Sequence, residues 1–527
     1  MSTDRQRELL DLIDYADEGF SHYRKEFITI ENMYHCVMDR DLKKVLDEAE
    51  KSSLYFNKSQ AKSRRISDSL LKNYFSNDKF ATILSKSDNT EMVDIAQAIE
   101  DETKDQLNTN QFFNAIVQGL YKVPYTGTLI TRTYWNDGIV TENVNIDDFR
   151  FDPDAISQED TRYVVHDIYV AIEDIKRMQR EGTYSRKINI DELITEDEAN
   201  SYTRVKLQEI YVRVGDDWKV STVYDNAYFF RADVILKDGM PFSWGGLLPQ
   251  TKKIEEENYI ANYYEPPLAS ILNLQEEYNA RRNQIIDAVK QSLNPKILVP
   301  KQSGLNPLDL KKPIGFIPVQ DPSRIVVLPS ADFRGGMQEI QTIDTEMSEI
   351  SGVSPMMNGV SVTSNKTATQ SGMEHSEGSL KLEIYTRHLN ETYFEPLIKR
   401  IALLCWKYAP EDNFIGVNRQ ATPKLKISFN TGLGVVNDVI KTELLDKNFQ
   451  RMATLLEMQM QIDPIKAKIT LNGLTELVRE GLSLSGIKNS DEYLGAKVEL
   501  GELAEQAQQM PQMMQQEQMM QQQQEGM

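Results

Sequence analysis

The sequence has few cysteines and no long apolar run, and each of these features excludes some classes of protein. Only Cys36 and Cys405 occur among 527 residues, so no disulfide framework is implied and a reducing cytosol fits. No stretch of about 18 uncharged apolar residues is present, so we predict that nothing spans a membrane. The first residues lead directly into charged helical sequence, which is not the pattern of a secretory signal.

Recognisable catalytic motifs are also missing. The sequence contains no Walker A motif, no GxGxxG and no GxSxG, and none of its histidines forms HExxH or a Cys/His cluster of metal-ligand spacing. We therefore predict no catalytic residue, no metal site and no cofactor. The dense carboxylates around Asp147 and Asp152 leave one alternative open, a metal-dependent nucleic-acid enzyme, although solvated acidic side chains are the simpler interpretation.

Basic residues are outnumbered by acidic ones. The chain has 59 Lys and Arg against 80 Asp and Glu, a formal net charge of −21 and a sequence pI near 4.9. A protein that grips nucleic acid by neutralising phosphates needs a basic face, so this balance argues against tight binding. It does not exclude a protein through which DNA passes, because an acidic wall repels the phosphate backbone and lets a duplex slide.

The length and the changing residue pattern predict several modules. The first 120 residues show helical periodicity, including an amphipathic stretch from Ser63 to Phe75 and another from Gln97 to Tyr121. An α+β region follows and ends near Tyr264. Its expected elements are strands at 128–135, 139–144 and 163–170, a helix at 172–181 closed by Gly182, and a hairpin of 207–214 with 218–224.

Residues 266–409 show the most informative order of elements. A helix over 266–293 is followed by a Pro-rich insert, a second helix over about 336–351, a polar loop and a long helix over about 373–408. Pro396 lies inside that long helix, so the sequence allows either one kinked helix or two shorter helices that meet there. A returning strand is expected at 424–430, and helices again after 437.

Several phrases in this order resemble the portal proteins of podovirus-type tailed phages, which are head-to-tail connectors. The resemblance covers about Asn57 to Leu456. It rests on the segment 145–153 (NIDDFRFDP), on 350–355 (ISGVSP), and on 357–359 (MNG) followed by 366–369 (KTAT). The helix–insert–helix–loop–helix order matches the same family.

The resemblance implies an α+β, predominantly helical portal-type fold with wing, stem, clip and crown, assembled as a ring. It assigns residues 1–265 to the wing, 266–293 and 335–352 to the stem helices, 294–334 to the clip, 353–372 to the tunnel loop, 373–436 to the long kinked helix and a wing return strand, and 437–527 to the crown, whose Gln/Met-rich C-terminal tail is a possible barrel.

The same resemblance implies candidate site residues. In the tunnel loop, polar groups that would face DNA are Asn358, Thr363, Ser364, Asn365, Lys366 and Thr367. In the stem, Arg281, Arg282 and Lys290 either reach the channel or pair with Glu276, Glu277 and Asp287. In the clip, the interface candidates are Lys296, Lys301, Lys311, Lys312 and Arg324.

The short apolar runs of the clip, 297–299 and 325–328, cannot form a core alone. Exposed strands of this kind need a partner. Strands of neighbouring subunits can provide one, or the two runs can pair as a small hairpin on their own chain.

The function implied by the resemblance is that of a portal at one capsid vertex, in the virion and in the host cytoplasm during assembly. Its partners would be eleven further copies of the chain, double-stranded DNA, the terminase large subunit, tail adaptor proteins, and the major capsid and scaffolding proteins. The chief alternative from the residues alone is a cytosolic helical interaction scaffold, which would form no ring.

Overall fold

The structure is a computed structural model that describes twelve stretches of the chain. The described residues are 2–75, 81–86, 89–109, 112–193, 203–250, 262–293, 297–298, 326–327, 334–353, 381–414, 417–419 and 421–429. The chain divides into two units, Met1–Thr431 and Gly432–Met527, and all described residues belong to the first. The helices and Gln/Met-rich tail predicted after residue 437 lie outside the described residues.

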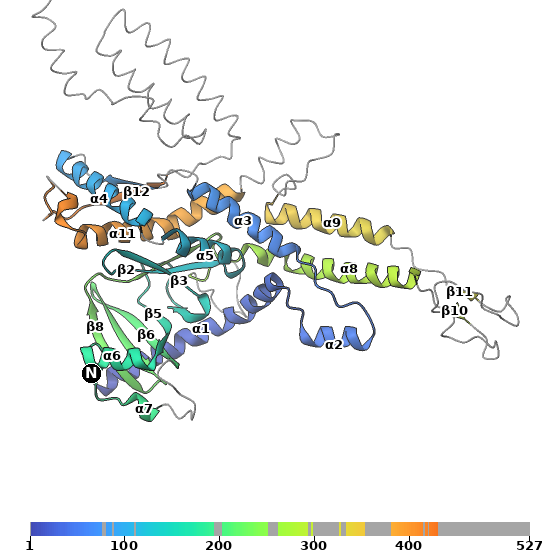
Figure 1. Cartoon of the computed structure of the whole chain (residues 1–527), viewed down its shortest axis with the longest axis horizontal. Coiled ribbons are helices and arrows are strands. Elements are labelled where there is room, and N and C mark those ends of the chain that lie inside the picture. The colour runs from blue at the N-terminus through green and yellow to red at the C-terminus, as the bar shows by residue number, and fades with distance from the viewer. Residues whose placement is uncertain are drawn as a thin grey trace, which may run out of the picture. The chain divides into compact units, whose positions relative to one another are not determined.

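An antiparallel sheet with the strand order β4-β5-β6-β7-β8 forms one layer of the described part of the chain (Figure 1). Its strands are β4 (Phe149–Phe151), β5 (Tyr163–Ala171), β6 (Arg204–Val214), β7 (Asp217–Tyr224) and β8 (Tyr228–Leu236). The predicted strand at 163–170 and the predicted hairpin are confirmed as β5 and as β6 with β7. The helix α6 (Ile172–Glu181) is confirmed as well, and it ends at Gly182, whose φ of 84° suits a residue without Cβ.

A second antiparallel sheet has the order β3-β2-β9. Strands β2 (Thr128–Trp135) and β3 (Ile139–Val144) confirm the predicted hairpin. Strand β9 (Phe242–Gly246) pairs with β2 on the other side, and the sequence pattern gave no sign of it. Gly246 is required there, because a Cβ would lie 2.3 Å from the Cβ of Tyr264.

The long helix α1 (Thr3–His35) joins the two sheets. Its first half buries Leu9 and Ile13 against the five-stranded sheet, and its second half buries an aromatic face that includes Tyr23. The ring of Tyr23 lies 4.5 Å from that of the fully buried Tyr263. Arg150, which is 9% exposed, binds α1 at Asp17 (2.8 Å) and β5 at Asp167 (2.9 Å). Burial of this ion-paired arginine fixes α1 in one rotation about its axis.

A helical layer covers the other face of the smaller sheet (Figure 1). It contains α3 (Lys58–Phe75), α4 (Thr90–Thr109), α5 (Phe112–Thr126) and α11 (Glu395–Tyr408). The helical pattern predicted over 97–121 is confirmed in the described residues, where α4 and α5 cover 97–109 and 112–121. The first 120 residues are mostly helical as predicted, with one strand that was not predicted: β1 (Ala81–Ser85) pairs with the predicted return strand, β12 (Leu425–Phe429). The partner of β1 is about 340 residues away, so local periodicity carried no signal for it.

The helix around Pro396 is one continuous helical element over residues 381–408, which excludes two separate helices. Residues Asn390–Phe394 (η6) form a π-helical turn directly before α11. A π turn widens the backbone ring by one residue, and such turns relieve the contact between a proline ring and the preceding carbonyls. The turn also buries both Tyr393 and Phe394, neighbours in sequence, in the core.

The buried His166 on β5 predicts a specific acid sensitivity. Its side chain is 8% exposed and packs on Phe149 and Phe242, and burial lowers its pKa to about 4. Between about pH 6.5 and pH 4 the unfolded chain therefore binds a proton that the folded chain does not bind. Stability is unaffected by this group at pH 7 and falls as the pH drops through that window, by up to about 3 kcal/mol.

Urea unfolding at several pH values measures this loss. The variant His166→Gln should show a shallower decline of stability between pH 6.5 and pH 5 than the wild type. Identical slopes for the two proteins would contradict the assignment, because the remaining carboxylates titrate equally in both.

Candidate functional site

Two antiparallel helices, α8 (Leu272–Leu293) and α9 (Arg334–Ser351), run side by side where the sequence predicts the two stem helices (Figure 1). The α-helical part begins later than predicted, because Pro267–Ile271 forms a 3₁₀ turn (η2). Gly336 allows the close approach of α9, since a Cβ there would lie 3.1 Å from Cγ1 of Ile285. Tyr278, Ile343 and Met347 form the apolar base of the pair together with residues of α1.

A ladder of polar side chains runs along a second face of α8. Its members are spaced four residues apart and bind the main chain of 52–59, which leads into the first turn of α3. They are Gln275, Asn279, Asn283 and Asp287. The amide oxygen of Gln275 accepts from the N–H of Ser59 (2.8 Å), and its Nε2 donates to the carbonyl of Phe56 (2.8 Å). The oxygen of Asn283 accepts from the N–H of Leu54 (3.0 Å), and its Nδ2 donates to the carbonyl of the same residue (2.8 Å). We call this set the α8 ladder.

The last rung of the α8 ladder is charged. The Asp287 carboxylate accepts from the N–H (3.0 Å) and the Oγ (2.5 Å) of Ser52 and lies 3.6 Å from Nζ of Lys290. Partial burial raises the pKa of Asp287, but the bonds from Ser52 and the Lys290 ammonium outweigh it, and the net pKa lies below its usual value. The carboxylate therefore stays ionised at neutral pH.

Helix α3 also contacts α9, through the buried side chain of one lysine. Lys62 is 4% exposed, donates to Oγ of Ser348 (2.6 Å) and lies 3.5 Å from the carboxylate of Asp344. Burial lowers its pKa, and Asp344 opposes that shift. Lys58 also binds Asp344 at 3.0 Å, so one carboxylate holds two ammonium groups of α3.

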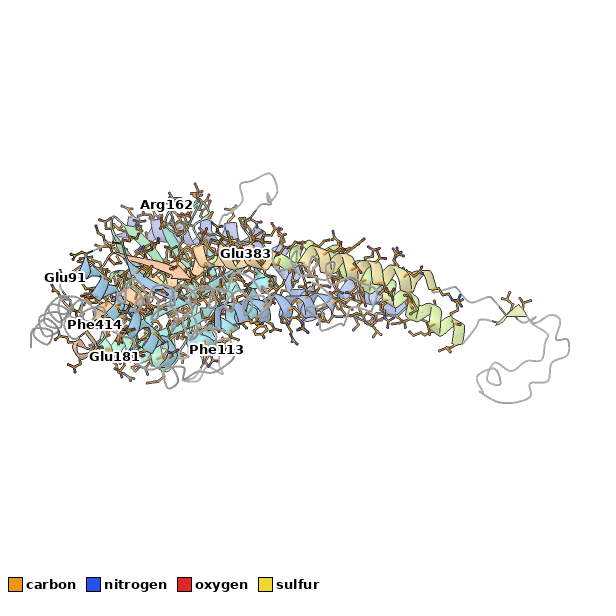
Figure 2. All side chains as sticks on the ribbon, turned by 90° about the horizontal axis from the view of Figure 1, so that it is seen from above. Glu91, Phe113, Arg162, Glu181, Glu383 and Phe414 are labelled. Carbon is orange, nitrogen blue, oxygen red and sulfur yellow. The ribbon has the colours of Figure 1, made fainter. Side chains whose placement is uncertain are left out.

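The C-terminus of α9 is capped by the next described helix. Nζ of Lys381 donates to the carbonyls of Glu349 (2.7 Å) and Ile350 (2.9 Å) in the last turn of α9, and the N–H of Gly352 also donates to the Glu349 carbonyl (3.3 Å). Gly352, with φ of 72°, ends the helix. Glu383, on the same helix as Lys381, lies near the base of the α8–α9 pair (Figure 2).

The predicted stem cations are engaged within their own chain. Arg281 lies 3.7 Å from Glu277, Lys290 binds Asp287 and Ser52, and the guanidinium of Arg282 lies 5.4 Å from the centroid of the Phe56 ring. Arg281 and Lys290 thus have carboxylate partners on α8, and their place at a channel stays a prediction. Both side chains keep more than 40% of their surface exposed.

The other predicted site residues lie outside the described residues. This holds for the tunnel-loop candidates between Asn358 and Thr367 and for the clip candidates Lys296, Lys301, Lys311, Lys312 and Arg324. Within the predicted clip the structure describes β10 (Ile297–Leu298) and β11 (Val326–Val327). They pair with each other in antiparallel register, which is the pairing within one chain that the sequence left open; pairing with a neighbouring subunit stays a prediction.

The carboxylates of the enzyme alternative are held by arginines. Asp152 is fully buried and accepts from the N–H and Nε of Arg162, and Asp147 lies 3.1 Å from Nε of Arg24. In the part of the chain that the structure describes, no group of three or more His, Cys, Asp or Glu side chains has metal-site geometry. In the same residues, no helix combines the length and apolarity that a membrane span requires.

A cleft of about 940 Å³ lies between α11 and the strand-rich part. Its charged lining is mixed, with Lys399 and Lys407 beside Glu391 and Glu395. The buried Arg400 donates to the carbonyls of Thr133, Asp238 and Met240, and burial lowers its pKa to about 10. These bonds join α11 to β2 and to the connection between β8 and β9, which gives this arginine a structural role.

Comparison with protein families settles the relationship that these helices suggest. The family model described as "Phage SU10 portal protein" matches residues 58–526. The chain belongs to this portal family. The match begins at Lys58, the first residue of α3, and includes both α8 and α9. None of the curated proteins matches the chain.

The α8 ladder of this portal protein was missed by the sequence analysis, although a signal was present. Three carboxamides and one carboxylate at positions 275, 279, 283 and 287 follow the helical repeat of about 3.6 residues and form one stripe. Polar stripes are usually assigned to solvent, and a partner that supplies only main-chain groups leaves no mark in sequence. The buried state of Gln275, Asn279 and Asn283 therefore appears only in three dimensions.

Replacing Asn283 by Ala removes two hydrogen bonds and should cost about 1–3 kcal/mol of stability. In hydrogen exchange, the amide of Leu54 should lose its protection in this variant, while the amide of Ser59, bound by Gln275, keeps it. The matched control is Gln284→Ala, an exposed neighbour on the same helix. A Leu54 amide that exchanges without protection in the wild-type protein would show that its hydrogen bond to Asn283 does not form.

Proposed function

We propose that the chain forms a homo-oligomeric ring of twelve copies at a single capsid vertex, with a central channel for packaging and ejecting double-stranded DNA. The family match over residues 58–526 carries this proposal. The α8–α9 pair supports it, because two antiparallel helices extending from a β-containing body suit the wall of a channel. Residues 266–293 and 335–352 would be the stem, and 1–265 with 373–436 the wing.

The remaining assignments complete the ring. Residues 294–334 would be the clip, which docks the terminase large subunit during packaging and tail adaptors afterwards. Residues 353–372 would be the tunnel loop, in which Lys366 is the only charge over 358–370. Residues 437–527 would be the crown inside the capsid. The major capsid and scaffolding proteins would contact the ring during assembly in the host cytoplasm.

The charge of the chain supports passage of DNA rather than static binding. Twelve copies multiply a formal charge of −21, so the ring as a whole repels phosphate. A duplex held by few contacts can slide, whereas a basic lining would bind it with strong salt dependence. ATP hydrolysis would belong to the terminase, and the portal itself would not be an enzyme.

Electron microscopy of the purified full-length chain, with mass measurement of the same sample, tests the proposal. We expect closed rings near twelve subunits whose central hole admits duplex DNA. A uniform monomer or dimer at all protein and salt concentrations would favour the helical scaffold instead. A ring without a through-channel would exclude the conduit.

A further inference from the structure

Helix α9 and the helix over 381–408 are connected in sequence by residues 354–380, yet they also meet directly. Nζ of Lys381 lies 2.7 Å from the carbonyl oxygen of Glu349 and 2.9 Å from that of Ile350, in the last turn of α9. An ammonium group at the C-terminus of a helix is favoured by the free carbonyls and by the helix dipole. Contacts outside the connecting residues therefore hold the two helices together.

The backbone at the end of α9 is shaped to receive Lys381. A Cβ on Gly352 would lie 2.8 Å from Cδ and 3.1 Å from Cβ of that lysine, so the two residues touch. Val353, the next residue, is 1% exposed and belongs to the same apolar cluster as Leu382 and Tyr385. The hydrogen bonds of the lysine are thus accompanied by apolar packing on both sides of the contact.

Helix α3 binds the same two helices. In its first half, Lys62 donates to Oγ of Ser348 on α9 at 2.6 Å. Near its end, the hydroxyl of Tyr74 donates to the carbonyl of Thr386 at 3.0 Å, and both residues are buried. One helix therefore bridges α9 and the helix that follows it in the described chain. We call the contacts of Lys381, Val353 and α3 the α9 joint.

We propose that the α9 joint, and not residues 354–380, holds α9 against the helix over 381–408, and that Lys381 is its positioning residue. The connecting residues are then separable from the fold of the subunit. Fixing the two ends of a connecting segment costs conformational entropy that grows with its length. A shorter connection should therefore leave the arrangement of the two helices intact and stabilise it slightly.

The consequence for function rests on the ring proposed above. Residues 353–372 are the proposed tunnel loop, and the α9 joint fixes the two helices that flank it. The part of the subunit that would meet DNA is then independent of the parts that would form stem and wing. Changes of length or sequence in the loop leave the remainder of the ring as it is.

Replacement of residues 354–380 by about six Gly and Ser residues tests the separation in an otherwise full-length chain, because Gly352 and Lys381 are in contact and a short flexible linker spans the gap. We expect a midpoint of thermal unfolding, followed by circular dichroism, equal to that of the wild type or slightly above it. A midpoint lowered by more than about 5 °C would show that the deleted residues hold the helices together, and would overturn the proposal.

The variant Lys381→Met tests the positioning residue, since it keeps the aliphatic stem and removes both hydrogen bonds. Hydrogen exchange of the amides of Gly352 and Val353, which donate to carbonyls of α9, should become about tenfold faster or more. Lys381→Arg should restore the protection, and the control Lys399→Met, an exposed lysine of the same helix, should leave it unchanged. Equal exchange in the two methionine variants, or no rescue by arginine, would contradict the role of Lys381.

Both measurements are made on the subunit, so they separate the α9 joint from the ring. A wild-type chain that forms no rings would overturn the proposed function and leave the joint in place. Failure of the shortened chain to fold would overturn the joint and leave the ring in place. Mass photometry should show rings of the shortened chain at the protein concentration at which the wild type forms them. A shortened chain that folds but forms no rings beside a ring-forming wild type would overturn the independence of the loop from the ring.

Discussion

The arrangement of the N-terminal helices depends on one kind of interaction, the hydrogen bonds between the side chains of the α8 ladder and the main chain of 52–59. A carboxamide offers a donor and an acceptor in one plane. Asn283 therefore pairs with both main-chain groups of Leu54, and Gln275 pairs with the carbonyl of Phe56 and with the N–H of Ser59 in the first turn of α3. Without these partners, buried N–H and C=O groups would be left unpaired at a cost of about 1–3 kcal/mol each. The bonds thereby set where α2 (Arg40–Glu48) and α3 stand relative to α8.

The elements that the sequence predicted are those whose signal is local. The hairpins β2–β3 and β6–β7 combine β-branched or aromatic runs with short turns such as Asn136–Gly138, and α6 ends at a glycine. Strands β1 and β9 were not predicted, because each depends on a partner far along the chain. Strand β8 was missed although it neighbours β7, because Arg231 and Asp233 interrupt its apolar residues and its alternation is weak.

The candidate site was predicted only in part, for the same reason. The spacing of apolar residues placed the helices α8 and α9, and the order of elements with the resemblance named the family that the family match then showed. What the side chains of α8 do could not be inferred from their spacing. Arg281 and Lys290 bind carboxylates on their own helix, one of the two options that the sequence left open, and amides that look solvent-facing are buried. The tunnel-loop and clip residues keep the status of predictions.

Because the α8 ladder binds main-chain groups, it constrains the length of the segment 52–59 more than the identity of its side chains. The bonds from α8 hold the N–H or C=O groups of Leu54 and Phe56 whatever their side chains are, so substitutions in this connection leave the contacts in place. A single inserted or deleted residue, in contrast, displaces every following peptide group from the α8 side chain that binds it. In this chain the length of the connection between α2 and α3 is therefore coupled to the polar stripe on α8, whereas the side chains of Leu54 and Phe56 take no part in those hydrogen bonds.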